Sequence, residues 1–106
     1  GGTTEISRIV IDTQHFRGNY PESVSIQYTD SYRHNKAEQL TIWSPLRSRT
    51  RMTPDAQHIF DMKQNELVQL TKNTQITHVR ICIYPDGGIS RVRIYAAPTR
   101  IPSSHL

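Results

Sequence analysis

The chain has 106 residues, with 13 lysine and arginine residues against 9 aspartate and glutamate residues, and a formal net charge of +4. Hydrophobic residues make up 35%, enough for one modest core but not for two domains. No apolar run approaches the roughly 20 residues of a membrane-spanning helix, so we expect no membrane association. The single Cys82 excludes an internal disulfide framework and fits a reducing, intracellular compartment.

Alternating apolar and polar residues predict a series of short β-strands, and no segment keeps a helical period. Residues 8–11 form the first expected strand, and residues 14–21 follow as a shaped loop because they are aperiodic and rich in turn formers. Residues 30–39 are polar and residues 44–55 contain two prolines, so we expect both as connections. Further strands are expected at residues 23–28, 40–43, 57–60, 66–70, 77–84 and 89–95.

The last two of these strands show the clearest pattern. Val79, Ile81 and Ile83 share one face of the first, and Val92 and Ile94 share one face of the second. Between them, Pro85-Asp86-Gly87-Gly88 is typical of a tight turn. We therefore expect an antiparallel hairpin with Arg80, Arg91 and Arg93 on its outer face. Residues 97–106 are expected as a flexible tail. Many short strands separated by turns predict an all-β protein with an antiparallel β-sandwich or jelly-roll fold.

The basic residues are scattered, and the tightest group is Arg47, Arg49 and Arg51. Binding to nucleic acid would favour a continuous basic stripe with interleaved aromatic residues, which the sequence lacks. We therefore interpret this group as a solvated loop and expect no nucleic-acid partner. Excess arginine also suits a small anionic ligand, because the guanidinium fork binds a carboxylate with two hydrogen bonds.

Three blocks of the sequence, in order and covering most of the chain, resemble the allantoicase family. They are Ile11 to Thr13 with His15 to Pro21; Trp43 to Leu46 with Pro54 to Phe60; and Thr77 to Arg80 with Tyr84 to Tyr95. The resemblance implies a galactose-binding-domain-like jelly roll. It further implies that residues 1–96 form a single allantoicase-type repeat, of which N-terminal strands are missing.

Enzymes of that family hydrolyse allantoate to ureidoglycolate and urea in purine breakdown, so the resemblance implies a hydrolase acting on linear amidines. It also implies allantoate as the substrate and a second repeat or a homo-oligomer as the partner. The alternative is a non-catalytic jelly-roll module that packs against a second repeat or binds a small ligand. The hypothesis that the chain is an enzyme requires the loop of His15 and the turn of Asp86 to lie at one end of the sandwich, around a cavity.

Hydrolysis of allantoate asks for an arginine on the carboxylate, polar groups on the ureido atoms, and a general acid or base. We assign catalysis to His15, Asn19 and His58, and substrate binding to Arg91, Arg80 and Asp86. Each assignment has a structural alternative. His15 and Asn19 would form hydrogen bonds within their own loop, and His58 would form a structural hydrogen bond at the end of a strand. Asp86 would cap the backbone of its turn, and the arginines would form a solvated face of the sheet.

The histidines show no close spacing of the kind that makes a local metal site, and a divalent metal cofactor is left open. The final tripeptide, Ser104-His105-Leu106, is similar to the peroxisomal Ser-Lys-Leu signal. We therefore expect a peroxisomal or otherwise cytoplasmic location.

Overall fold

The computed structural model describes residues 4–30, 34–35, 40–70 and 74–98. The strands are β1 (Thr4–Asp12), β2 (Ser23–Asp30), β3 (His34–Asn35), β4 (Leu40–Thr41), β5 (Ser44–Arg51), β6 (Gln57–Asp61), β7 (Ile76–Tyr84) and β8 (Arg91–Pro98). One short 3₁₀ helix, η1 (Met62–Gln64), follows β6. Within these ranges, no helix has the length and apolar character needed to cross a membrane.

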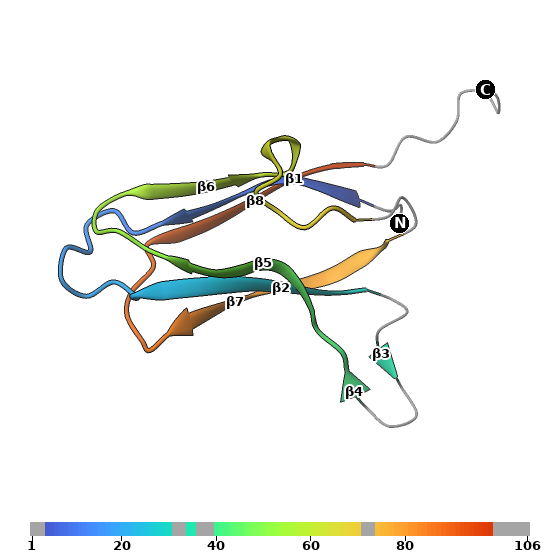
Figure 1. Cartoon of the computed structure of the whole chain (residues 1–106), viewed down its shortest axis with the longest axis horizontal. Coiled ribbons are helices and arrows are strands. Elements are labelled where there is room, and N and C mark those ends of the chain that lie inside the picture. The colour runs from blue at the N-terminus through green and yellow to red at the C-terminus, as the bar shows by residue number, and fades with distance from the viewer. Residues whose placement is uncertain (1–3, 31–33, 36–39, 71–73, 99–106) are drawn as a thin grey trace.

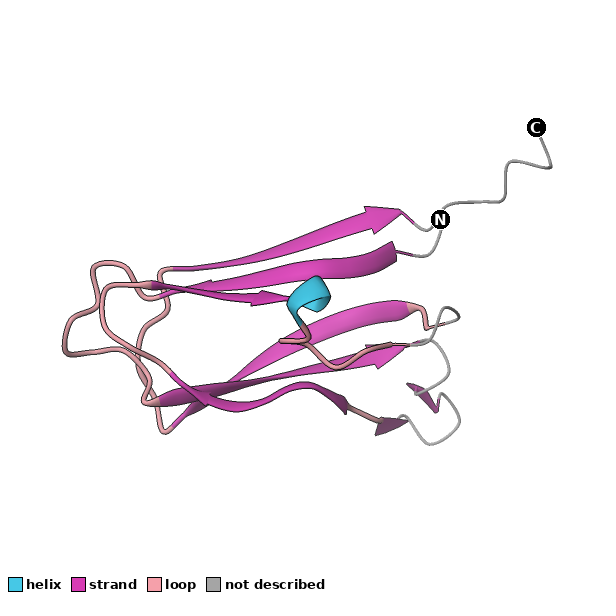
Figure 2. Ribbon diagram, turned by 45° about the horizontal axis from the view of Figure 1, so that its top comes forward, coloured by secondary structure: helices cyan, strands magenta, loops and turns pink. Residues whose placement is uncertain are grey.

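Two antiparallel three-stranded sheets form the body of the molecule. The strand orders are β6-β1-β8 and β5-β2-β7, and a separate two-stranded ribbon pairs β3 with β4. The two sheets stack as layers of a sandwich (Figures 1 and 2). The core lies between the central strands, where Ile9 and Ile11 of β1 and Val24 and Ile26 of β2 are fully buried. The expected all-β, jelly-roll-type sandwich is confirmed.

The expected hairpin of the last two strands is wrong. β7 pairs with β2, whereas β8 pairs with β1, so these consecutive strands belong to different sheets. Residues 85–90 therefore cross from one layer to the other instead of closing a turn. The alternating pattern correctly marked the inward faces of both strands, but alternation cannot tell which strand lies alongside.

Three further expectations about elements need correction. Residues 44–51 form β5 and not a connection, because β5 is an edge strand and its Pro45 removes no hydrogen bond that the sheet requires. Of residues 40–43, only Leu40–Thr41 is a strand. Residues 66–70 are irregular. The strands expected at residues 8–11, 23–28 and 57–60 are confirmed within β1, β2 and β6.

The C-terminal segment falls only partly within the description. β8 extends to Pro98, so the first two residues of the expected tail belong to a strand. The remainder, including the tripeptide Ser104-His105-Leu106, lies outside the described residues.

One side of the sandwich is closed by the segment that follows η1. Leu67 of this segment is buried in the core. The Val68 N–H donates to the Leu46 carbonyl of β5 at 2.7 Å, and Nη1 of Arg47 donates to the Glu66 carbonyl at 3.1 Å. These bonds fasten the segment to the edge strand β5 and cover the apolar layer there.

The described residues leave the opposite side, between the edge strands β7 and β8, uncovered. Ile83, Val92 and Ile94 point inward, since they lie opposite Val24, Ile11 and Ile9, yet they remain 38%, 39% and 46% exposed. Inward-facing apolar side chains with this much exposure leave part of the core uncovered.

Two buried threonines allow a matched test of this packing. The Thr13 hydroxyl donates to the Thr53 carbonyl at 2.7 Å and accepts from the Ala56 N–H at 3.1 Å. The Thr29 hydroxyl has no hydrogen-bond partner within the described part of the chain. Both side chains are at most 2% exposed.

We predict that the same substitution has opposite effects at the two sites. Thr13→Val should lower the free energy of unfolding by about 1–3 kcal/mol, because it leaves the half-buried Ala56 N–H without its partner. Thr29→Val should raise it by up to about 1 kcal/mol, because it removes a buried hydroxyl without a partner. Urea titration followed by circular dichroism measures both. Equal destabilisation by Thr13→Val and Thr29→Val would contradict the difference in hydrogen bonding between the two hydroxyls.

Candidate functional site

Three connections meet at one end of the sandwich (Figure 1, left). They are the His15 loop (residues 13–22), the Asp55 loop (residues 52–56) and the Asp86 crossover (residues 85–90). The Thr13 N–H donates to the Ala56 carbonyl at 2.8 Å, which joins the first two. The Gly88 N–H donates to the Asn19 carbonyl at 2.7 Å, which joins the crossover to the His15 loop. The site is therefore built from segments far apart in the sequence.

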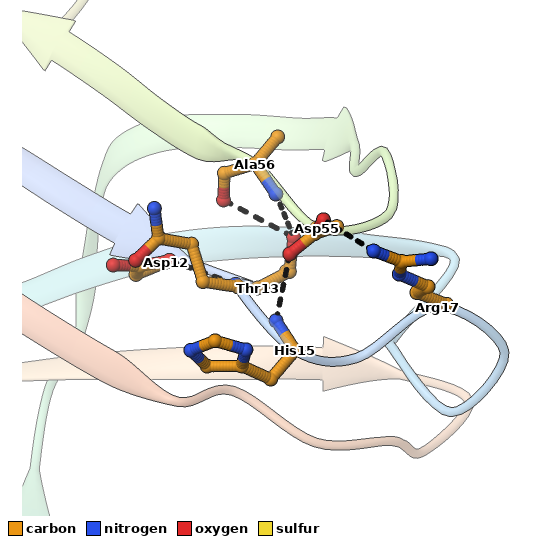
Figure 3. Close-up of polar contacts among 7 residues, drawn as sticks. Asp12, Thr13, His15, Arg17, Asp55 and Ala56 are labelled. Atoms are coloured by element: carbon orange, nitrogen blue, oxygen red, sulfur yellow. Dashed lines mark hydrogen bonds and ion pairs between the residues drawn. The ribbon is translucent and has the colours of Figure 1, made fainter.

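Asp55 holds the His15 loop in place (Figure 3). Its carboxylate accepts the His15 N–H at 2.8 Å and lies 3.6 Å from Nη2 of Arg17. Its own N–H donates to the Phe16 carbonyl at 3.2 Å. Asp55 and His15 have φ angles of 48° and 72°, in the left-handed region that aspartate and histidine tolerate better than most residues. Sequence reasoning missed Asp55, although its place after Pro54 indicated a turn.

A surface cavity of about 410 Å³ lies at this end. Its lining includes two arginines, Arg17 and Arg51, and two acidic residues, Glu22 and Asp86. Tyr20 contributes an aromatic ring. The site can therefore offer guanidinium donors and carboxylate acceptors to one small polar ligand.

Two glycines allow the crossover to approach the His15 loop. Gly87 has a φ of 130°, and a Cβ at this position would lie 2.5 Å from the Pro21 nitrogen. A Cβ on Gly88 would lie 2.3 Å from the Phe16 ring. Glycine is thus required at both positions by backbone conformation or by space. The close approach places Asp86 at the cavity.

The predicted residues of the His15 loop and of the crossover lie at the same end, but neither His15 nor Asn19 is among the residues that line the cavity. Asp86 lines the cavity. The main-chain carbonyl of Asn19 accepts the hydrogen bond from the Gly88 N–H, whereas the Asn19 side chain is exposed. His15 precedes the cavity residue Arg17 by two positions, and its side chain is also exposed. The loop and the turn thus lie around a cavity at one end of the sandwich, as the hypothesis of an enzyme requires.

The ring of His58 is occupied by hydrogen bonds on both nitrogens. The Thr53 N–H donates to Nε2 at 2.9 Å, so the proton resides on Nδ1, which faces the Ile11 carbonyl at 3.2 Å. The ring thus joins the Asp55 loop to β1. This geometry favours the structural alternative for His58, and its catalytic role stays a prediction.

The two arginines predicted to bind substrate are not brought together. Arg80 lies on the outer face of β7, opposite Gln27, whereas Arg91 opens β8 opposite Asp12 in the other sheet. Neither lines the cavity. They were expected on one outer face because a hairpin was expected, and that pairing is wrong. The cavity instead holds Arg17 and Arg51, which sequence reasoning did not single out as ligand-binding residues.

No group of three histidine, cysteine, aspartate or glutamate side chains is gathered as a metal site among the residues that the structure describes. The described site is thus a cavity of arginine and carboxylate groups, enclosed by loops at the end of an antiparallel sandwich. This is the common location for a ligand site in a jelly-roll-type protein.

Comparison with known proteins supports a jelly-roll-type protein and identifies its family. The sequence model of the family described as "Allantoicase repeat" matches residues 1–99, and the chain belongs to this family. A probable allantoicase of Stutzerimonas stutzeri is 40% identical over 98 residues, covering 90% of this chain and 28% of its own length. One of Schizosaccharomyces pombe is 37% identical over 95 residues, with 90% and 26% covered.

Solved allantoicase structures share the fold. The crystal structure of the Saccharomyces cerevisiae enzyme superposes with a TM-score of 0.63 at 27% identity, covering 88% of this chain and 23% of that one. A second allantoicase structure gives a TM-score of 0.65 at 26% identity, with 89% and 24% covered. The chain thus spans about a quarter of the length of these relatives.

The space around two glycines predicts different effects of the same substitution on stability. Gly87→Ala should lower the free energy of unfolding by at least about 2 kcal/mol, because the new Cβ meets backbone atoms at an unfavourable φ. Gly18→Ala is the control, since no atom lies within 4 Å of a Cβ there, and it should change stability by less than about 0.5 kcal/mol. Thermal unfolding of both variants tests this. A tolerant Gly87 would contradict the close approach of the crossover.

Proposed function

We propose that this chain takes part in the hydrolysis of allantoate to ureidoglycolate and urea, and that the cavity between its loops binds the substrate. The observation that carries the proposal is the lining of this cavity, in a chain of the allantoicase repeat family. Because the chain spans about a quarter of its relatives, the remainder of the enzyme would complete the assembly.

The lining matches the groups of the substrate. Allantoate carries one carboxylate and two ureido groups on a single carbon. Arg17 or Arg51 would bind the carboxylate through the guanidinium fork, which matches it with two hydrogen bonds. Glu22 and Asp86 would accept hydrogen bonds from the ureido N–H groups, and Tyr20 would pack against the ligand. A cavity of about 410 Å³ is large enough for a molecule of this size.

The exposed loop side chains would supply the remaining chemistry. In the overall reaction, water gives its oxygen to the central carbon, and a proton passes to the nitrogen of the departing urea. His15 would act as the general base and then the general acid, because its side chain is exposed and it lies two residues before Arg17 of the cavity. Asn19 would bond a ureido oxygen. His58 would position the Asp55 loop.

A second, non-catalytic function is favoured by the open side of the sandwich. The exposed inward-facing residues of β7 and β8 form an apolar strip beside two unpaired strand edges. We propose that a second repeat, further strands or a second copy covers this strip. The two functions are compatible, since the strip and the cavity use different residues.

Activity measurements test the catalytic proposal. Urea release from allantoate is measured for the purified chain, with and without added divalent metal, and allantoate binding is measured by calorimetry. Arg51→Gln should weaken binding at least about tenfold, because it removes a charged hydrogen bond. His15→Ala should leave binding intact and lower turnover about 10²-fold.

Arg93→Gln on an outer face is the control and should change neither quantity. Unchanged binding in Arg51→Gln would show that the cavity is not the substrate site. Binding without turnover by folded protein would indicate that catalysis requires the rest of the enzyme.

The open side predicts association. Light scattering should find the chain as an oligomer at micromolar concentration, and Ile94→Lys should shift it toward the monomer by placing a charge on the strip. Ser48→Lys, at an exposed position of the edge strand β5 away from the strip, is the matched control. A sharp monomer peak with cooperative unfolding of the unaltered chain would contradict the prediction.

A further inference from the structure

Two guanidinium–ring stacks lie across the outer face of the sheet β5-β2-β7. Cζ of Arg49 is 4.2 Å from the centre of the Tyr84 ring, and Cζ of Arg80 is 4.3 Å from the centre of the Trp43 ring. Arg49 belongs to β5 and Tyr84 to β7, which flank β2 on either side. A stack between the two flanking strands must therefore pass over β2. We call these four residues the stack face.

The stacks explain an unusual burial beneath them. Ser23 and Ser25 point to the outer face of β2, since Val24 and Ile26 between and beyond them lie in the core. Nevertheless Ser23 and Ser25 are only 4% and 8% exposed. The larger side chains from β5 and β7 cover them, and the small serines leave room for this.

Hydrogen bonds to β2 fix the orientation of both guanidiniums. Nε of Arg49 donates to Oγ of Ser23 at 2.6 Å, and Nε of Arg80 donates to Oε1 of Gln27. The Tyr84 hydroxyl lies 3.1 Å from Oγ of Ser25. In the described part of the chain, the terminal guanidinium nitrogens make no ion pair. Two arginines are thus held with their terminal nitrogens free of ion pairs to the described residues.

Basic residues outnumber acidic ones in the three strands of this sheet, whose single acidic residue is Asp30. Of their four arginines, Arg49 and Arg80 lie on the outer face, whereas Arg51 lines the cavity and Arg47 lies over the Phe60 ring of the other sheet. The ion pair between Arg17 and Asp55 lies elsewhere, at the loop end. Such a surface is complementary to one that carries carboxylates.

We propose that the stack face docks an acidic protein surface, whose carboxylates are received by Arg49 and Arg80. Arginine, tyrosine and tryptophan are the residues that most often dominate the energetics of protein interfaces. The stacking and the Nε bonds restrain the arginines before binding, which lowers the entropy cost of docking. Nucleic acid is disfavoured, because a ring that already carries a guanidinium is not an open platform for a base.

The test uses fluorescein-labelled octaglutamate as the probe and fluorescence anisotropy at low salt. The variant Arg49→Gln with Arg80→Gln should weaken binding at least about tenfold. The matched control is Arg8→Gln with Arg93→Gln in β1 and β8. It removes the same charge and also breaks a stack, since Arg8 lies 4.6 Å from the centre of the Tyr95 ring. The control should change binding by less than about twofold.

A second variant, Arg49→Lys with Arg80→Lys, retains the charge and guards against loss of fold. It should still lose most of the affinity, because lysine lacks the planar fork. Equal losses in the glutamine variant and the control would show an effect of net charge alone and would overturn the proposal. Failure of the folded chain to bind octaglutamate would do the same. The proposal would also be overturned if the chain bound octathymidylate more tightly than octaglutamate and if Arg49→Gln with Arg80→Gln abolished that binding.

Discussion

The contact of the Asp86 crossover with the His15 loop is the constraint on which the candidate site depends. β7 and β8 lie in different sheets, so residues 85–90 must pass from one layer to the other at the loop end. They do so directly against the backbone of Tyr20 and Pro21, at a distance that leaves no room for a Cβ on Gly87. The hydrogen bond from Gly88 to Asn19 fixes this approach. Because of it, Asp86 shares a cavity with Arg17 of the His15 loop and with Arg51, the last residue of β5.

The sequence predicted the strands better than their partners. Alternation located β1, β2, β6 and the inward faces of β7 and β8, because burial on one face imposes a period of two. It could not show that β7 and β8 join different sheets, since that choice is made by packing across the sandwich. The prolines concealed β5, because proline is tolerated at an edge and the sequence does not reveal which strand is the edge.

The same limit applied to the site. His15, Asn19 and Asp86 were selected from turn chemistry and from resemblance to a family, and the structure places them at one end of the molecule. Arg51 was missed because it was expected in a solvated loop, whereas it ends a strand beside the cavity. Asp55 was missed because its function is to hold a loop through the His15 N–H, and a backbone contact leaves no pattern in the sequence.

Arginine serves several different purposes in this chain, and the position of each residue in the fold decides which. Arg17 pairs with Asp55 at the cavity, and Arg47 bonds the Glu66 carbonyl, which closes one side of the sandwich. Arg49 and Arg80 lie over aromatic rings on an outer face. These locations separate ligand binding from assembly, because the cavity, the open side and the stack face share no side chain. A partner could therefore cover the open side or the stack face and leave the loop end accessible to a small ligand.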